Sequence, residues 1–207
     1  MFTPPLEQIV TPNRLKEAAW AVTSKAAGPD GRTIDAYRDE EALRRLHEEI
    51  VNGRYAPLPL ERIELTKEDG TARPLGISAP RDKIVQKCLA EALTPHFDRT
   101  FSNKSYGYRP GRGVLRAVNR TRDFLAKNHR FVFKTDIDNF FETIPHDKLL
   151  QLLRETIADG RIVDLIAMFL KNGAFKGFDY LDHTGGVHQG DPLSPLPRTH
   201  LKNPHGR

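Results

Sequence analysis

Two aspartates stand one residue apart at the end of an apolar run near the middle of the chain. The stretch FKTDIDNFFETIPHD, residues 133–147, places Asp136 and Asp138 directly after alternating phenylalanines. The alternation predicts a buried or half-buried strand over 131–136, which brings Asp136 to the rim of a sheet, and Asp138 can share its face. A carboxylate there either caps the following turn or binds a hard cation such as Mg²⁺.

Composition sets the bounds on the fold that holds these acids. The 207 residues are 38% hydrophobic, enough for one sizeable core and a second, smaller lobe. Lysine and arginine outnumber acids by 32 to 27, which favours a polyanionic partner, although an ordinary basic surface explains the same balance. The single cysteine, Cys88, excludes an internal disulfide and is expected in the core. We expect a cytoplasmic protein, since neither a membrane span nor a signal-peptide pattern is seen.

The order of predicted elements indicates an α+β fold. A hairpin is expected in YAPLPLERIELTKEDGTARPLGIS, with its turn at residues 68–70, and a short strand pair in FKGFDYLDHTGGVHQG. The last residues, 197–207, break the apolar pattern, and we expect them to be disordered. Helices are predicted over residues 12–27, 39–52, 81–97, 112–127, 146–157 and 161–171.

Three loops carry residues that suit phosphate or nucleotide binding. Lys67 and Arg73 flank the hairpin turn, where they form either a solvated surface or a clamp for phosphates. The linker FSNKSYGYRPGRG interleaves tyrosines with arginines, which either stack on nucleic acid or pack against the domain. In GVHQGDPLSP, Gly186 and Gly190 permit close backbone approach, and Gln189 can hydrogen-bond a ligand.

The order of these segments resembles the motif series of reverse transcriptases, most closely the group II intron-like bacterial branch. GPDG from Gly28 and NGRYAPLP from Asn52 also resemble that branch's N-terminal extension and first fingers strand, so the resemblance covers about residues 25–196. The five ordered matches are KEDGTARPLGI from Lys67, DKIVQ from Asp82, SYGYRPG from Ser105, DIDNFF from Asp136 and GVHQGDPLSP from Gly186.

The resemblance implies an RNA-directed DNA polymerase, a nucleotidyltransferase that uses Mg²⁺, an RNA template, a DNA primer and deoxynucleoside triphosphates. It implies the fingers and a partial palm of a right-hand polymerase. The expected divisions are an N-terminal helical extension over 1–55, fingers over 56–130, the partial palm over 131–196 and an aberrant or disordered tail over 197–207.

The same resemblance gives roles to the aspartate segment. Asp136 would coordinate both magnesium ions, and the backbone carbonyl of Ile137 would help to hold one of them. Two such ions lower the pKa of the primer 3′-hydroxyl and stabilise the leaving pyrophosphate. Phe141 would be the steric gate whose ring excludes a ribose 2′-hydroxyl, while its neighbour Phe140 is expected to be a core residue.

The remaining roles concern the incoming nucleotide. Lys67 and Arg73 would hold its triphosphate, with Arg81 as a further candidate. Gln189 and Gly190 would line the pocket for its sugar and base.

The sequence departs from the family pattern at its end. No YADD-like motif, the second acidic motif of the family, occurs between Met1 and Arg207, so the chain resembles a reverse transcriptase truncated before that motif. A single aspartate facing two divalent ions should bind metal weakly, so we expect little or no polymerisation by this chain alone.

Other functions remain open at this stage. A non-catalytic RNA-binding remnant of a reverse transcriptase is the main alternative, whereas a metal-dependent hydrolase lacks the expected cluster of ligands around Asp136. The motifs are compatible with intron mobility, CRISPR spacer acquisition, retron synthesis or phage defence.

Overall fold

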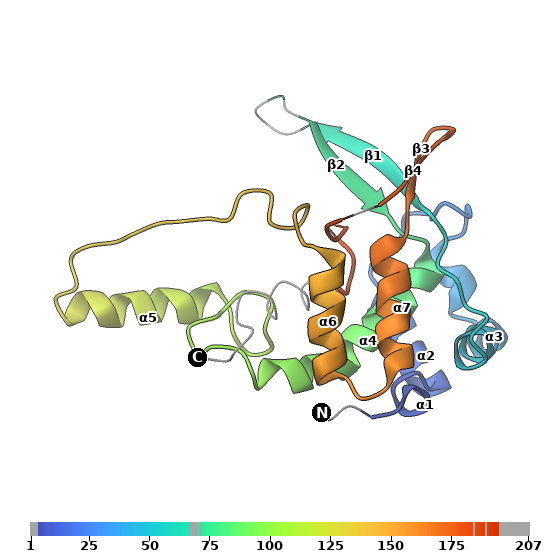
Figure 1. The fold of residues 1–207 in the computed structure, drawn as a ribbon, viewed down its shortest axis with the longest axis horizontal. Coiled ribbons are helices and arrows are strands. Elements are labelled where there is room, and N and C mark those ends of the chain that lie inside the picture. Colours follow the sequence, from blue (N-terminus) through green and yellow to red (C-terminus); the bar gives the residue numbers. More distant parts are fainter. Residues whose placement is uncertain (1–3, 67–69, 71, 184, 189, 195–207) are drawn as a thin grey trace.

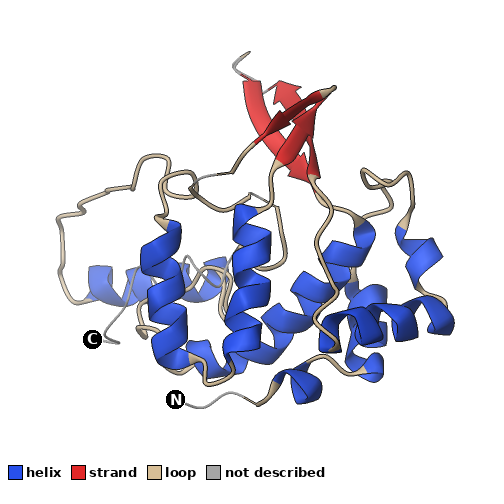
Figure 2. Cartoon of the chain, turned by 45° about the vertical axis from the view of Figure 1, so that its right-hand side comes forward, coloured by secondary structure: helices blue, strands red, loops and turns tan. Residues whose placement is uncertain are grey.

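The computed structural model describes residues 4–66, 70, 72–183, 185–188 and 190–194. It is an α+β structure in which helices form the body, a small sheet stands at one end, and an arm built on one helix projects sideways (Figures 1 and 2). The helices are α1 (Leu6–Ile9), α2 (Pro12–Ala21), the 3₁₀ helix η1 (Ile34–Tyr37), α3 (Glu40–Val51), α4 (Pro80–Asp98), α5 (Val114–Ala126), α6 (His146–Thr156) and α7 (Gly160–Lys171). The strands are β1 (Leu60–Thr66), β2 (Ala72–Ile77), β3 (Ala174–Lys176) and β4 (Asp179–Leu181).

Capping residues fix the starts of the N-terminal helices. The Thr11 hydroxyl accepts a hydrogen bond from the backbone N–H of Arg14, and Pro12 occupies the first position of α2. The Asp39 carboxylate caps α3 in the same way. Helix α2 ends at Ala21, earlier than predicted, because β-branched residues follow and the backbone becomes extended at Val22.

Helix α4 lies at the centre of the core. It packs against α1, α2 and η1, and α6 and α7 pack against each other beside it (Figure 2). Cys88 is 2% exposed, which confirms its predicted core position. None of the helices in the described part of the chain combines the length and the apolar character that crossing a bilayer requires.

The predicted hairpin and strand pair join into one sheet with strand order β2-β1-β3-β4. Strands β1 and β2 are antiparallel, as are β3 and β4, and both hairpins were predicted. The parallel pairing of β1 with β3, which sets Leu60 beside Ala174, was not predicted, because sequence patterns do not show which distant strands become neighbours.

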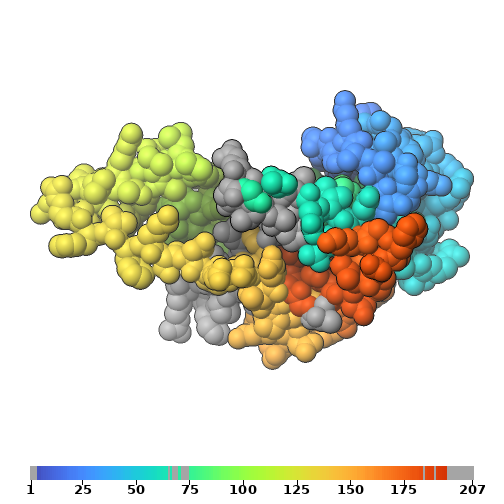
Figure 3. All heavy atoms as spheres, turned by 90° about the horizontal axis from the view of Figure 1, so that it is seen from above, coloured from blue at the N-terminus to red at the C-terminus, as the bar shows by residue number. Residues whose placement is uncertain are grey.

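An arm, defined here as residues 114–139, extends away from the body (Figures 1 and 3). None of the α5 residues is buried. The predicted strand over 131–136 is wrong: the segment has no regular secondary structure, and Phe131 and Phe133 are 99% and 89% exposed. A strand needs a neighbour to take its backbone hydrogen bonds, and no described strand lies beside this one.

Candidate nucleotide-binding site

The loop over residues 185–191, here called the glycine loop, is bonded to the segment that carries Phe141. The backbone N–H of Val187 donates to the carbonyl of Phe141 at 2.7 Å, and that of Gly186 donates to Ile144 at 2.9 Å. Gly186 has φ 86°, and a Cβ there would lie 2.6 Å from the Phe141 oxygen. Only glycine therefore fits, and the structure brings together two segments that were predicted to share a site.

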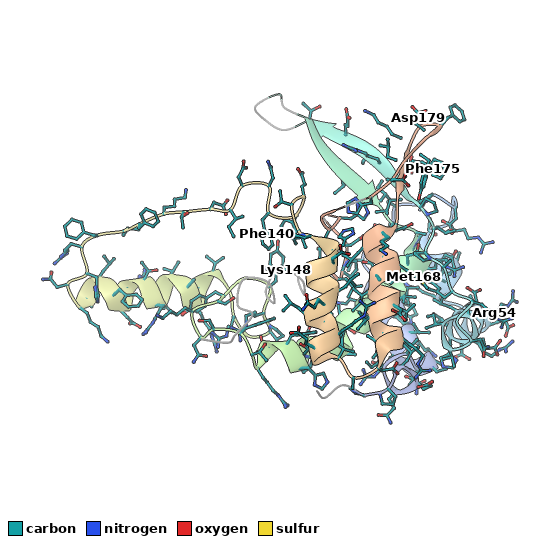
Figure 4. The ribbon with its side chains drawn as sticks, in the orientation of Figure 1. Arg54, Phe140, Lys148, Met168, Phe175 and Asp179 are labelled. Carbon is teal, nitrogen blue, oxygen red and sulfur yellow. The ribbon has the colours of Figure 1, made fainter. Side chains whose placement is uncertain are left out.

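The two phenylalanines do not divide into core and surface as expected. Phe140 and Phe141 are both partly buried against the hydrophobic core, and their rings meet edge to face at 5.6 Å. Phe140 lies at the amino-terminal end of α6 (Figure 4). Burial alone does not distinguish the predicted gate residue from its neighbour.

Three imidazoles lie at the glycine loop, and one of them, His188, belongs to it. His146 Nε2 lies 2.6 Å from the Gly186 carbonyl oxygen and His183 Nε2 lies 3.3 Å from it, so each ring donates its Nε2 hydrogen there. The His188 ring stacks on His183 with centroids 3.9 Å apart and contacts the carbonyl of Asn172 at 2.9 Å. Burial, and then the positive charge that His188 can acquire, lower the pKa of His183 to about 4.

The partly buried side chain of Asp191 holds the carboxyl-terminal end of the glycine loop in place. Asp191 accepts hydrogen bonds from the hydroxyl of Ser78, just after β2, and from the side chain of Gln86 on α4. Ser78 and Gln86 are each 2% exposed. Burial raises the pKa of Asp191, although these hydrogen bonds act in the opposite direction. The loop is thus tied to the hairpin and to the central helix as well as to Phe141.

Asp82, the acid of the DKIVQ motif, has a structural role. Asp82 is 1% exposed and accepts hydrogen bonds from the Tyr55 hydroxyl at 2.6 Å and the Leu58 N–H at 2.9 Å. Burial raises its pKa to about 6. Arg81, a candidate for triphosphate binding, instead pairs with Glu49 at 2.5 Å and covers the Tyr55 ring.

The glycine loop also lies against the hairpin strand β2. A Cβ built on Gly190 would meet Leu75 at 3.6 Å, and one on Gly76 would meet His188 at 3.6 Å. Lys67 and Gln189 lie outside the described residues. The backbone of Arg73 belongs to β2, but its side chain is likewise outside the description.

Asp136 lies on the exposed arm, not at the hydrogen-bonded site. Its carboxylate accepts the backbone N–H of Ile137 at 2.9 Å, its only hydrogen bond within the described structure. No group of three or more His, Cys, Asp or Glu side chains that could hold a metal occurs in the described ranges. Mg²⁺ commonly takes one or two carboxylates and fills its other positions with water and phosphate oxygens. Asp136 therefore fits a metal that arrives with nucleotide phosphates, and does not form an all-protein metal cage.

Sequence reasoning missed the supports of the glycine loop. It singled out Gly186, Gln189 and Gly190, but not the contacts of His146 or those among Ser78, Gln86 and Asp191, because these partners are remote from each other in the sequence. A buried polar residue inside an apolar helix, such as Gln86 in IVQKCL, is the one sign that a partner must lie nearby.

Comparison with known proteins identifies the class to which this fold and loop belong. The family model described as reverse transcriptase (RNA-dependent DNA polymerase) matches residues 65–199, and the chain belongs to this family.

Relatives place it among group II intron-like reverse transcriptases. It is 35% identical to Protein YkfC of Escherichia coli over 201 residues, which cover 92% of this chain and 53% of YkfC. It is 31% identical to the group II intron-encoded protein LtrA of Lactococcus lactis, covering 79% of this chain and 27% of LtrA. The chain thus spans about half the length of YkfC and less of LtrA.

A solved structure shares the fold. In the partial Cas6-RT-Cas1–Cas2 complex, one chain superposes with a TM-score of 0.64 and 23% identity, covering 95% of this chain and 34% of that one. At this identity the likeness concerns the fold alone.

Proposed function

We propose that this chain contributes the fingers and the first part of the palm to an RNA-directed DNA polymerase. The observation that carries the proposal is the glycine loop, which is bonded to the Phe141 segment on one side and lies against β2 on the other. The loop motif is thereby in contact with two other motifs of the family. Family membership adds the expectation of an RNA template, a DNA primer and deoxynucleotide substrates.

Within that proposal, residues 1–55 form the N-terminal extension, 56–130 the fingers and 131–196 the partial palm. Phe141 lies beneath the sugar of the incoming nucleotide, and Gly190 lets the backbone approach it closely. Lys67 and Arg73 contact the triphosphate from the hairpin, and Gln189 bonds the sugar or base.

Asp136 and the Ile137 carbonyl are the proposed magnesium ligands. When bound, the metal would supply charge stabilisation for the phosphates and activate the primer hydroxyl. Because Asp136 sits on the arm, we propose that it joins the site only together with the nucleotide and the nucleic acid.

The test measures binding of a primer annealed to an RNA template by fluorescence anisotropy. The polymerase proposal expects Mg²⁺ and the next complementary deoxynucleotide to tighten binding several-fold. Asp136→Asn should remove this response without changing binding in the absence of nucleotide. Asp138→Asn, two residues away on the same arm, is the matched control and should retain the response.

The alternative is an RNA-binding remnant without chemistry, favoured by the exposed position of Asp136. A remnant binds RNA with a strong salt dependence and ignores both Mg²⁺ and nucleotide. Equal affinity with and without the complementary deoxynucleotide would therefore decide for the remnant.

A further inference from the structure

The extended part of the arm, residues 130–136, leaves its backbone hydrogen-bonding groups unused. None of its N–H or C=O groups bonds to another backbone group that the structure describes. The segment runs back along α5 toward the body, and it projects where a second molecule can reach its edge (Figures 1 and 3). An unpaired extended edge of this kind readily takes up another extended chain. The arm therefore offers the backbone of one strand to a partner.

The same part of the arm also leaves apolar side chains in water. Phe131, Val132 and Phe133 are all largely exposed, and the alternation of an extended chain puts the two phenylalanines on one face. Helix α5 adds an apolar stripe, in which Val114 and Leu125 are exposed as well. Contiguous apolar surface on a folded protein marks a site of interaction. The arm thus presents both a strand edge and an apolar face.

The order of the charges shows that a second copy of the segment fits this edge. Arg130 and Asp136 lie three residues before and three residues after Phe133. If two copies run antiparallel with Phe133 opposite Phe133, Arg130 of each copy therefore lies opposite Asp136 of the other. Opposite charges that face each other across two strands stabilise the pair. The segment is in this way complementary to itself, as a two-fold symmetric contact requires.

Other alignments of the two copies are less favourable. A shift by one residue puts the phenylalanines of the two copies on opposite faces of the ribbon. A shift by two residues sets Arg130 opposite Lys134 in one direction and Lys134 opposite itself in the other, and like charges in these positions destabilise the pair. The alignment centred on Phe133 avoids all three faults, because it sets Lys134 opposite Val132.

We propose that two copies of this chain associate through residues 130–136, paired antiparallel with Phe133 opposite Phe133 and Arg130 opposite Asp136. Phe131 and Phe133 of both copies then form one aromatic cluster, and the apolar stripe of α5 is available to cover it. A ribbon of two strands is only marginally stable, so we expect a dissociation constant on the order of 100 μM. At low micromolar concentration the chain is therefore a monomer.

This inference goes beyond the proposed polymerase function and does not depend on it. The dimer uses Asp136 in an ion pair, so a paired copy does not offer that carboxylate to Mg²⁺. A chain that pairs but shows no response to Mg²⁺ and deoxynucleotide contradicts only the polymerase proposal. A chain that shows the response but stays monomeric at every concentration contradicts only the dimer.

The experiment measures sedimentation velocity of the whole 207-residue chain at a series of concentrations, in about 0.15 M salt to screen the net positive charge. The unaltered chain should shift from monomer to dimer as its concentration rises. Arg130→Glu sets two carboxylates opposite each other at both ends of the ribbon, and Asp136→Arg sets two guanidinium groups there. Each variant alone should weaken association about tenfold or more.

Mixing the two variants tests the alignment itself. In a dimer of one Arg130→Glu chain with one Asp136→Arg chain, both ends of the ribbon again bring opposite charges together. An equimolar mixture should therefore regain the dimer that neither variant forms alone at the same total concentration. The matched controls are Arg116→Glu on α5 and Asp138→Arg, which change the net charge equally but lie outside residues 130–136. Both controls should associate like the unaltered chain, and far-ultraviolet circular dichroism establishes that every variant is folded.

Three results would overturn the proposal. The first is an unaltered chain that remains monomeric throughout the concentration series. The second is a dimer that folded Arg130→Glu and Asp136→Arg form as readily as the unaltered chain, which would place the contact on another surface. The third is a mixture of the two variants that stays monomeric, which would contradict the pairing of Arg130 with Asp136.

Discussion

The glycine loop and the arm carry neighbouring motifs of one family, yet the chain holds them in different ways. The loop has backbone hydrogen bonds to Phe141 and Ile144, imidazole contacts at Gly186 and a partly buried, hydrogen-bonded carboxylate at Asp191. The arm exposes its phenylalanines and has no buried residue in α5.

The difference lies in where each segment finds its hydrogen-bond partners. The glycine loop finds them within this chain, in helices α4 and α6 and in the segments before α6 and after β2, so its shape is set before any ligand arrives. The segment before Asp136 has no described strand beside it, so the acid is not positioned. The proposed nucleotide-binding surface and the proposed metal ligand are therefore separable here, and variants in the two regions should behave differently.

The largest expected difference in the free energy of unfolding is between alanine variants of two phenylalanines. Phe97 in α4 is 1% exposed, and Phe97→Ala should lower the free energy of unfolding by about 3 to 5 kcal/mol, because it leaves a cavity in the core. Phe133→Ala on the arm should change it by less than about 0.5 kcal/mol. Urea denaturation followed by circular dichroism measures both. A comparable loss for Phe133→Ala would show that the arm is packed in solution.

Alanine substitutions at two glycines test the contact between the glycine loop and the Phe141 segment. Gly186 and Gly177 both have positive φ, but a Cβ meets the Phe141 carbonyl only at Gly186 and finds open space at Gly177. Gly186→Ala should cost about 2 to 4 kcal/mol through backbone strain and the clash. Gly177→Ala should cost about 1 kcal/mol, since only the left-handed conformation is penalised. Equal losses in urea midpoint would contradict the contact between the loop and Phe141.

The smallest expected effect is a pH dependence of the stability of the folded chain, which arises from His183 beside the glycine loop. Unfolded His183 gains a proton near pH 6.5, whereas in the folded chain it does so only near pH 4. Between these values the unfolded state binds more protons, so the contribution of His183 to stability falls as the pH falls from 6.5 to 4. His183→Gln should lose less stability than the unaltered chain between pH 7 and pH 4.5.

Asp82 serves as a control in the comparison of the unaltered chain with His183→Gln. Asp82 has a raised folded pKa of about 6, so its contribution falls as the pH rises from 3.8 to 6, opposite to His183. Both chains contain Asp82, and the difference between their urea midpoints isolates the histidine. An identical acid-induced loss in both would contradict the burial of His183.

Sequence patterns predicted the features that depend on neighbours along the chain. The core position of Cys88 and both hairpins follow from local spacing and turn chemistry. The glycines of the loop were recognised by their type. The strand over 131–136 was not correct, because its apolar alternation describes what the segment would do beside a neighbour. The histidine contacts were invisible because they join residues from three separate segments.

The parallel contact between β1 and β3 has a consequence for how the protein is made. A ribosome delivers the β1–β2 hairpin long before residues 174–176 emerge, so one edge of β1 stays unpaired through much of translation. The nascent hairpin offers that edge to any other extended peptide nearby. Chaperone occupancy during synthesis should therefore concentrate on the hairpin and end once β3 has left the exit tunnel.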